Sequence, residues 1–220
     1  MDKLEISNIK KKIIEMNNAR FAPMVLTFIV CVIIFFNILD YVGTSLGGNY
    51  DWLILPAKMF GMPDEISEYY GNQTLYNYND GCGWDGQFYY YISNDLFGTK
   101  GFSENVDAPS YRWQRIGVPL LAKIVSLVLL KKNVSVSMFI GTQVALVLLG
   151  FFVATKWLNE NKKSLFWAMP WVLSCGVLVT LRSALPDAGA DALFIIAFIM
   201  LLKKKYYFYS FFMTLTCLSR

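Results

Sequence analysis

Three short segments of the chain carry acidic and basic side chains at spacings that could do chemistry. In the first segment, 79–91, glycines surround Asp85 and an aromatic run follows it. This pattern predicts a turn that leads into an interfacial helix, with Asp85 at or near the N-terminus of that helix. The helix dipole there favours an ionised carboxylate, which can act as a general base or bind a divalent cation. Taken alone, the composition of this segment favours a plain Asp-Gly turn with aromatic membrane anchors.

The second segment, 111–119, contains two arginines three residues apart. Arg112 and Arg115 would share one face of a helix. Arginine side chains hold phosphate oxygens well, so the target could be an anionic headgroup or a lipid-linked phosphate. The spacing alone favours ordinary anchoring at the membrane interface.

The third segment, 182–191, contains Asp187 and Asp191, which are four residues apart and face the same way on a helix. Asp191 lies inside an apolar run, where an ionisable side chain is costly and usually functional. The alternative is a shallow charge near the helix end that the outer headgroup layer still wets. We favour the functional interpretation of this pair.

The composition excludes several classes of protein. Hydrophobic residues make up 55% of the 220 residues and charged residues only 16%, with a net charge of +4. A soluble domain carries about 25% charged residues, because water must wet its surface. We therefore expect no soluble globular domain and no nucleic-acid partner. The chain has no histidine, and its four cysteines form no CxxC pair, so neither a His-based site nor a zinc or disulfide framework is expected.

Apolar runs must position these segments, and they predict an all-α polytopic integral membrane protein. A basic segment, 1–20, precedes the first run and is expected in the cytoplasm, which places the N-terminus inside the cytoplasmic membrane. The stretch 40–111 is rich in acids and poor in Lys and Arg, which suits the outer face, and the predicted outer loop covers 40–133. The final run covers only ~20 Å, so we expect a truncated, N-terminal part of a longer membrane protein. The predicted spans are 21–39, 134–158, 164–181, 185–202 and the truncated 206–220.

The apolar segment 116–130 could either span the membrane or lie at its surface. If it spanned, Lys156, Lys162, Lys163 and the triplet 203–205 would all face outside. If it lies in the outer interface, these lysines face the cytoplasm with the basic N-terminus, although Lys131 and Lys132 are then outside. The positive-inside rule favours the second topology. We therefore expect 112–130 to be an interfacial or re-entrant helix, Asn161 to be cytoplasmic, and Gly83 and Lys131 to be outside.

Two of these segments carry a family resemblance. Residues 83–90 read Gly-Trp-Asp-Gly-Gln-Phe-Tyr-Tyr, and residues 111–116 read Tyr-Arg-Trp-Gln-Arg-Ile. The pair resembles the motifs of a GT-C glycosyltransferase subgroup linked to bacterial cell-surface glycopolymer formation. Trp84 and Trp113 stand where a Tyr is commoner in that subgroup. Residues 215–220, Leu-Thr-Cys-Leu-Ser-Arg, look like the start of a further family motif.

The resemblance implies a GT-C-like helical bundle and a transferase that acts on the outer face. Its donor would be a polyprenyl-phosphate-linked sugar, and its acceptor a cell-envelope glycan or lipid beside the membrane lipids. Asp85 maps onto the family's essential acid and Asp187, less securely Asp191, onto its second acid. Gln87 in the first motif is a candidate substrate-binding residue with Asp191, Arg112 and Arg115. No cofactor is indicated with certainty, but Mg²⁺ or Mn²⁺ held by Asp85 and Asp187 is a candidate.

The competing interpretation is a non-enzymatic membrane component: a scaffold, a flippase subunit or a transporter fragment. A transporter should place ionisable residues near the middle of the bilayer in broken, repeated helices. Here the acids lie in loops on one face and no repeat is visible, which favours surface chemistry. The expected truncation leaves open whether this chain is active alone. If the acids form one site, the carboxylates of Asp85 and Asp187 should lie within ~10 Å, with a cation, Arg112 or Arg115, nearby.

Overall fold

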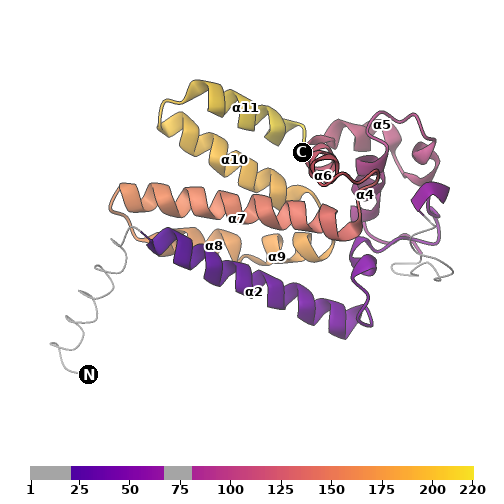
Figure 1. Cartoon of the computed structure of the whole chain (residues 1–220), viewed down its shortest axis with the longest axis horizontal. Coiled ribbons are helices and arrows are strands. Elements are labelled where there is room, and N and C mark those ends of the chain that lie inside the picture. Colours follow the sequence, from indigo (N-terminus) through magenta and orange to yellow (C-terminus); the bar gives the residue numbers. More distant parts are fainter. Residues whose placement is uncertain (1–20, 67–80) are drawn as a thin grey trace.

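Helices make up the regular structure of the described part of the chain. The computed structural model describes residues 21–66 and 81–220, and within these ranges no strand occurs (Figure 1). The prediction of an all-helical fold is confirmed for this part of the chain. The predicted cytoplasmic segment 1–20, and residues 67–80 of the predicted outer loop, lie outside the described residues.

Two helices are long and apolar enough to cross a membrane. α2 covers Ala22–Ser45 with 24 residues, and α7 covers Val136–Glu160 with 25. Each is about 36 Å long, which exceeds the ~30 Å hydrocarbon core of a bilayer. Large apolar side chains of α2 stand exposed, among them Phe28 at 69% and Phe36 at 59%. Such a surface suits lipid rather than water, so the chain has the marks of a membrane protein.

The stretch predicted as a single span, 164–181, is broken. It consists of the 3₁₀ turn η4 (Leu165–Ala168), α8 (Met169–Val172) and α9 (Cys175–Arg182), with a bend of 49° at the break. Ser174 causes the restart, because its side chain accepts a hydrogen bond from the Val177 N–H and caps a new helix. Pro170 also lacks the N–H that a continuous helix would use at that position. The two pieces together count as at most one further span.

The last two helices are shorter. α10 covers Asp187–Leu202 and α11 covers Tyr206–Cys217, which gives about 24 Å and 18 Å. α10 lies between α7 and α11 (Figure 1). Its contact with α7 is close, because a Cβ added at Gly150 would lie 2.9 Å from the Cβ of Ala192. Small residues at such crossings let two helix backbones approach, as they do within membranes.

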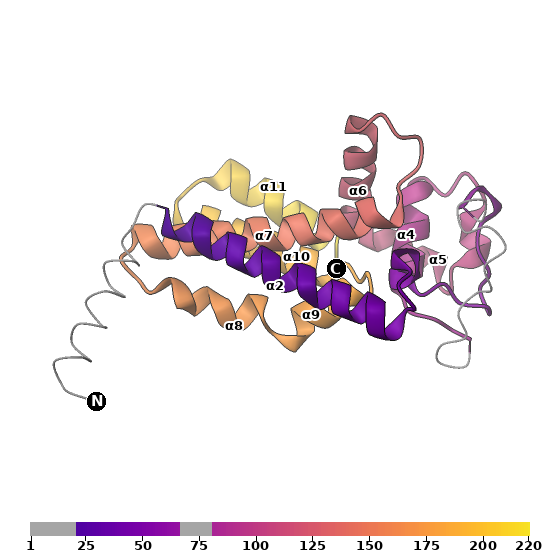
Figure 2. The same cartoon turned by 60° about the horizontal axis from the view of Figure 1, so that its bottom comes forward.

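A cap of short helices covers one end of the bundle. Its members are η1 (Tyr50–Ile54), α4 (Gly86–Asn94), η2 (Phe102–Asn105), α5 (Pro109–Arg112), η3 (Trp113–Arg115) and α6 (Gly117–Val128). α6 lies across the bundle instead of along it (Figures 1 and 2). With 12 residues it reaches only about 18 Å. This orientation suits the predicted interfacial helix better than a span.

One prediction about the cap is wrong. The aromatic run after Asp85 was expected to anchor an interfacial helix, yet every residue of α4 is buried. Phe88, Tyr89, Tyr90 and Tyr91 are each at most 2% exposed and form much of the cap's core. α6, η1, η2 and α7 pack against α4, so these rings contact protein instead of headgroups.

The lysine-rich turns lie at the opposite end of the bundle from the cap. The turn after α7 and the turn between α10 and α11 are side by side there (Figure 1). Lys203 Nζ joins them by an ion pair with Glu160 Oε2 at 2.6 Å. The bundle therefore has one lysine-rich end and one end that carries the three segments with candidate chemistry.

Candidate functional site

The first and third segments meet through Gly86. A Cβ built at Gly86 would lie 2.1 Å from the carbonyl oxygen of Ser183 and 2.9 Å from the Cβ of Ala184. Only glycine allows α4 to start this close to the turn between α9 and α10. That turn is also held by α7, since Gln143 Nε2 donates to the Ala184 carbonyl at 3.2 Å. Asp85 is therefore fixed beside the turn that leads to Asp187.

The second segment meets the end of the chain in the same way. The N–H of Gly117 donates to the carbonyl oxygen of Leu218 at 2.6 Å. A Cβ at Gly117 would lie 2.2 Å from Ser219 Oγ, and Ser219 is only 1% exposed. Four segments thus lie at the cap end of the bundle: the motif segments 83–90, 111–116 and 215–220, and the third segment, 182–191.

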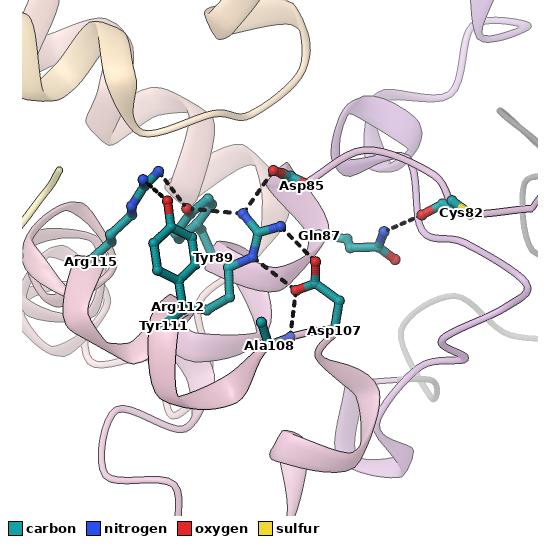
Figure 3. A network of polar contacts seen from close by, with 9 residues as sticks. All are labelled: Cys82, Asp85, Gln87, Tyr89, Asp107, Ala108, Tyr111, Arg112 and Arg115. Atoms are coloured by element: carbon teal, nitrogen blue, oxygen red, sulfur yellow. Dashed lines mark hydrogen bonds and ion pairs between the residues drawn. The ribbon is translucent and has the colours of Figure 1, made fainter.

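Asp85, Arg112 and Asp107 form a network of ion pairs (Figure 3). Asp85 is the N-cap residue of α4, as predicted, but its side chain makes no capping hydrogen bond. It reaches Arg112 instead, with Oδ2 2.7 Å from Nη1. Asp107 accepts two further bonds from Arg112, from Nε at 2.9 Å and from Nη2 at 2.8 Å. Such a two-point contact fixes the orientation of the guanidinium plane.

Arg112 is buried within this network. Its side chain is 8% exposed, whereas that of Asp85 is 52% exposed. Its guanidinium lies 5.0 Å from the ring centre of Phe88, and Nη1 also donates to the Tyr89 hydroxyl at 3.2 Å. Burial works to lower the pKa of Arg112, but its bonds to Asp107, Asp85 and Tyr89 outweigh burial and raise that pKa. Since all three guanidinium nitrogens already donate to protein, Arg112 acts here as a support for Asp85.

Arg115 occupies the other side of Tyr89. Its Nη1 donates to the Tyr89 hydroxyl at 3.3 Å, and its Nη2 donates to the Tyr111 hydroxyl. Burial works against the positive form, but the hydrogen bond to Tyr89 and the negative charge of Asp187 raise the pKa of Arg115. Arg115 therefore interacts electrostatically with Asp187. Its Nε is buried without a hydrogen-bond partner among the described residues. Unlike Arg112, Arg115 has no carboxylate bonded to it in the described part of the chain.

The third segment brings its own ion pair. α10 begins at Asp187, in the first turn behind the N-cap Pro186, so Asp187 itself is not the cap. One turn further along, Asp191 Oδ1 accepts from Arg220 Nη2 at 2.6 Å. Asp191 is thus compensated by a cation from the last residue of the chain. Sequence reasoning singled out Asp191 because of its apolar surroundings, and this pair explains how the fold tolerates it.

Gln87 lies apart from this network. It is fully buried, and its Nε2 donates to the Cys82 carbonyl at 3.0 Å (Figure 3). Its Oε1 accepts from the Ala57 N–H at 2.8 Å. Both ends of the amide therefore hold the loop before α4 against the segment that follows η1. In this position Gln87 supports the site and does not face a substrate.

The side chains around Asp85 do not suit a divalent cation. Across residues 21–66 and 81–220, no three Cys, Asp or Glu side chains are grouped so that they could hold a metal ion. One carboxylate oxygen of Asp85 is bonded to Arg112, whose guanidinium already supplies positive charge there. The predicted Mg²⁺ or Mn²⁺ at Asp85 and Asp187 therefore lacks a fitting donor set, and we derive no step through a metal.

Sequence reasoning missed several members of the site. Asp107, Tyr89 and Tyr111 hold the two arginines, and Arg220 pairs with Asp191. Asp107 stands five residues before Arg112, which was the available signal for that pair. Nothing local signals Tyr89 or Arg220, because their partners are 26 and 29 residues away along the chain.

A substitution at Gly86 tests the contact between the two segments. Gly86→Ala places a methyl group against the Ser183 carbonyl, so α4 or the turn must move. We expect a loss of about 1–3 kcal/mol in the free energy of unfolding, the usual range for overpacking. Thermal unfolding in detergent measures it. Gly43→Ala in α2 is the matched control, because a Cβ there meets nothing within 4 Å. Equal stability of the two variants would contradict the contact.

Comparison of this chain with protein-family models, curated proteins and solved structures finds no match. The resemblance to GT-C glycosyltransferases therefore stays a prediction that rests on the motifs alone. What the site can do is argued below from its own geometry.

Proposed function

We propose that this chain belongs to a polytopic glycosyltransferase of the cytoplasmic membrane. It would take a sugar from a polyprenyl-phosphate donor and pass it to a cell-envelope glycan or lipid on the outer face. The observation that carries the proposal is the half-exposed carboxylate of Asp85, held by a buried arginine beside the turn that leads to Asp187. The motif resemblance supports the same assignment.

The charges of the network suit a general base. Asp85 and Asp107 share one guanidinium, so the three side chains together carry a net negative charge. Arg112 binds Oδ2 of Asp85, and Oδ1 has no hydrogen-bond partner within the described residues. An acceptor hydroxyl could donate to that oxygen. A positioned carboxylate in this role typically raises the rate by about 10²–10⁴-fold.

The reaction follows from this placement. The acceptor oxygen bonds to the anomeric carbon of the sugar while its proton passes to Asp85. The bond from that carbon to the phosphate oxygen breaks, and its electron pair stays on the lipid phosphate. Direct displacement of this kind inverts the anomeric centre. Arg115, which has no carboxylate bonded to it within the described residues, is the cation we assign to the leaving phosphate.

The proposed orientation places the cap outside and the lysine-rich end in the cytoplasm. The Lys203–Glu160 ion pair supports it, because it brings the two lysine-bearing turns to one end. The positive-inside rule then assigns that end to the cytoplasm. A donor on the outer face would meet Asp85 directly.

Cysteine labelling tests this orientation. In a chain whose four native cysteines are replaced by serine, Lys131→Cys should react with an impermeant maleimide added outside intact cells. Asn161→Cys should react only after the membrane is permeabilised. Lys131 and Asn161 are both exposed. Gly83 is not a suitable labelling position, because a Cβ there would lie 2.3 Å from the Leu55 carbonyl oxygen. Labelling of Lys131→Cys only from the cytoplasmic side would overturn the orientation.

The activity itself is tested in membranes that express the gene. A polyprenyl phosphate carrying a radiolabelled sugar is added, and the label is followed into polymer or lipid. Transfer above that of membranes with an empty vector supports the proposal. Label that stays on the donor, with the protein present and folded, favours the non-enzymatic alternative.

A further inference from the structure

A groove of about 320 Å³ runs between α2 and α7 on the outside of the bundle. Its walls are apolar and include Ile34, Ile38, Leu53, Val136 and Ile140. Gly141 leaves part of the floor open, because a Cβ there meets nothing within 4 Å. The two helices that form the groove are the two that are long enough to span a membrane. An apolar groove on such a pair faces lipid chains.

A second cavity, of about 430 Å³, adjoins the end of this groove that is nearest to the cap. It is lined by Lys131 and Lys132 together with Asp51, Tyr90 and Asn133. The side chains of both lysines are free of ion pairs within the described residues, and both residues are exposed. This cavity combines two positive charges with polar neighbours.

The two cavities are neighbours. Val136 lines both of them, and the adjacent residues Tyr50 and Asp51 line one each. Apolar side chains are exposed just before the lysines, with Val128 at the end of α6 at 75% and Leu130 in the loop at 94% exposed. Lysines beside exposed apolar side chains are typical of a protein surface at the boundary between headgroups and acyl chains.

From this arrangement we infer that the chain holds an anionic phospholipid of the outer leaflet. The lipid phosphate lies at Lys131 and Lys132, and one acyl chain lies in the groove between α2 and α7. The order of the two cavities matches the order of a lipid's parts, with the charged headgroup at the boundary and the chain toward the middle of the bilayer. The inference rests on the membrane placement of α2 and α7 and, for the choice of leaflet, on the orientation proposed above. It does not depend on sugar transfer.

The acids near the second cavity do not prevent this. Asp51 brings one negative charge to this cavity, against the two positive charges of Lys131 and Lys132. Glu65 interacts with Lys132 but is already paired with Lys100, Nζ to Oε2 at 2.8 Å. The lysine pair thus remains the main charge that a phosphate would meet.

Native mass spectrometry of the full chain in detergent tests the inference. The chain is titrated with dioleoyl-phosphatidylglycerol and, separately, with dioleoyl-phosphatidylcholine. We expect one phosphatidylglycerol to bind at least tenfold more tightly than phosphatidylcholine. A lysine near an anionic lipid contributes about fivefold in affinity, so Lys131→Ala with Lys132→Ala should weaken binding more than tenfold.

Two matched controls accompany these variants. Lys162→Ala with Lys163→Ala removes a lysine pair at the opposite end of the bundle and should leave the affinity unchanged. Gly141→Leu places a side chain in the groove, where its Cβ meets nothing within 4 Å, and should weaken binding of both lipids. Gly43→Leu, whose Cβ also meets nothing within 4 Å, should not. Thermal unfolding confirms that each variant is folded.

Three results would overturn the inference. An equal loss of lipid affinity in the two double lysine variants would show a general attraction of anionic lipid. Full competition by millimolar inorganic phosphate, with no effect of Gly141→Leu, would show a site for a free anion. Unchanged lipid binding in Gly141→Leu, together with a dimer in wild type that this variant abolishes, would show that a second copy of the chain covers the groove. Sugar transfer measured on the same variants reports separately on the proposed activity.

Discussion

Asp85→Asn should lower sugar transfer from the polyprenyl-phosphate donor at least about 100-fold, the usual scale for a lost general base. The amide keeps the shape of the side chain and can still contact Arg112, but it cannot take a proton from the acceptor hydroxyl. The loss should appear in kcat, with little change in the KM for the donor. The assay compares initial rates in membranes that contain equal amounts of folded protein.

Asp40→Asn is the matched control for this variant. Asp40 is an exposed aspartate near the end of α2, outside the network around Asp85. Its replacement removes one negative charge toward the same end of the bundle and should leave transfer unchanged. Unchanged transfer in Asp85→Asn would exclude this carboxylate as the base.

Arg112→Lys should reduce transfer by an amount close to that of Asp85→Asn. A lysine keeps the charge, but a single ammonium cannot hold Asp107 at two points and bond Asp85 at 2.7 Å in the same geometry. Asp85 would then lose its fixed orientation. Since the side chain of Arg112 is buried in an aromatic surrounding, some loss of stability is also expected, and thermal unfolding measures it.

The double variant separates positioning from a direct role in the reaction. If Arg112 acts through Asp85, Arg112→Lys combined with Asp85→Asn should be no slower than Asp85→Asn alone. Multiplied effects would instead give Arg112 a contact of its own with the substrate. A merely structural role predicts a loss of stability without this dependence on Asp85.

The long helices of this fold could be predicted because their signal is local. An apolar run of sufficient length predicts α2 and α7, whose observed ends lie within about six residues of the predicted ones. The shortness of the segment after Arg115, with the lysine distribution, also predicts a helix that does not span, and α6 lies across the bundle. The break at Ser174 was missed, because a capping hydrogen bond inside an apolar run leaves little trace in hydropathy.

The site was predictable only in part. Asp85, Arg112 and Arg115 stand out by residue type and spacing. The sequence does not show that Arg112 supports Asp85 while Arg115 remains available for a phosphate. That difference depends on tertiary contacts with Asp107, Tyr89 and Tyr111. Gln87 lies in the same motif, yet the fold uses it inside the protein. The motif thus identified the region of the site. Burial and hydrogen bonding then distinguished the supporting residues, Arg112 and Gln87, from the exposed Asp85.

The most direct test of the central claim is sided sugar transfer in sealed proteoliposomes. The protein is reconstituted with a short-chain polyprenyl phosphate that carries a radiolabelled sugar, and an acceptor extract is added outside. Vesicles whose cap faces out, sorted by labelling at Lys131→Cys, should transfer the label, and the Asp85→Asn protein in the same vesicles should not. Transfer that is equal in the two proteins, or that occurs only when the cap faces the lumen, would contradict the account.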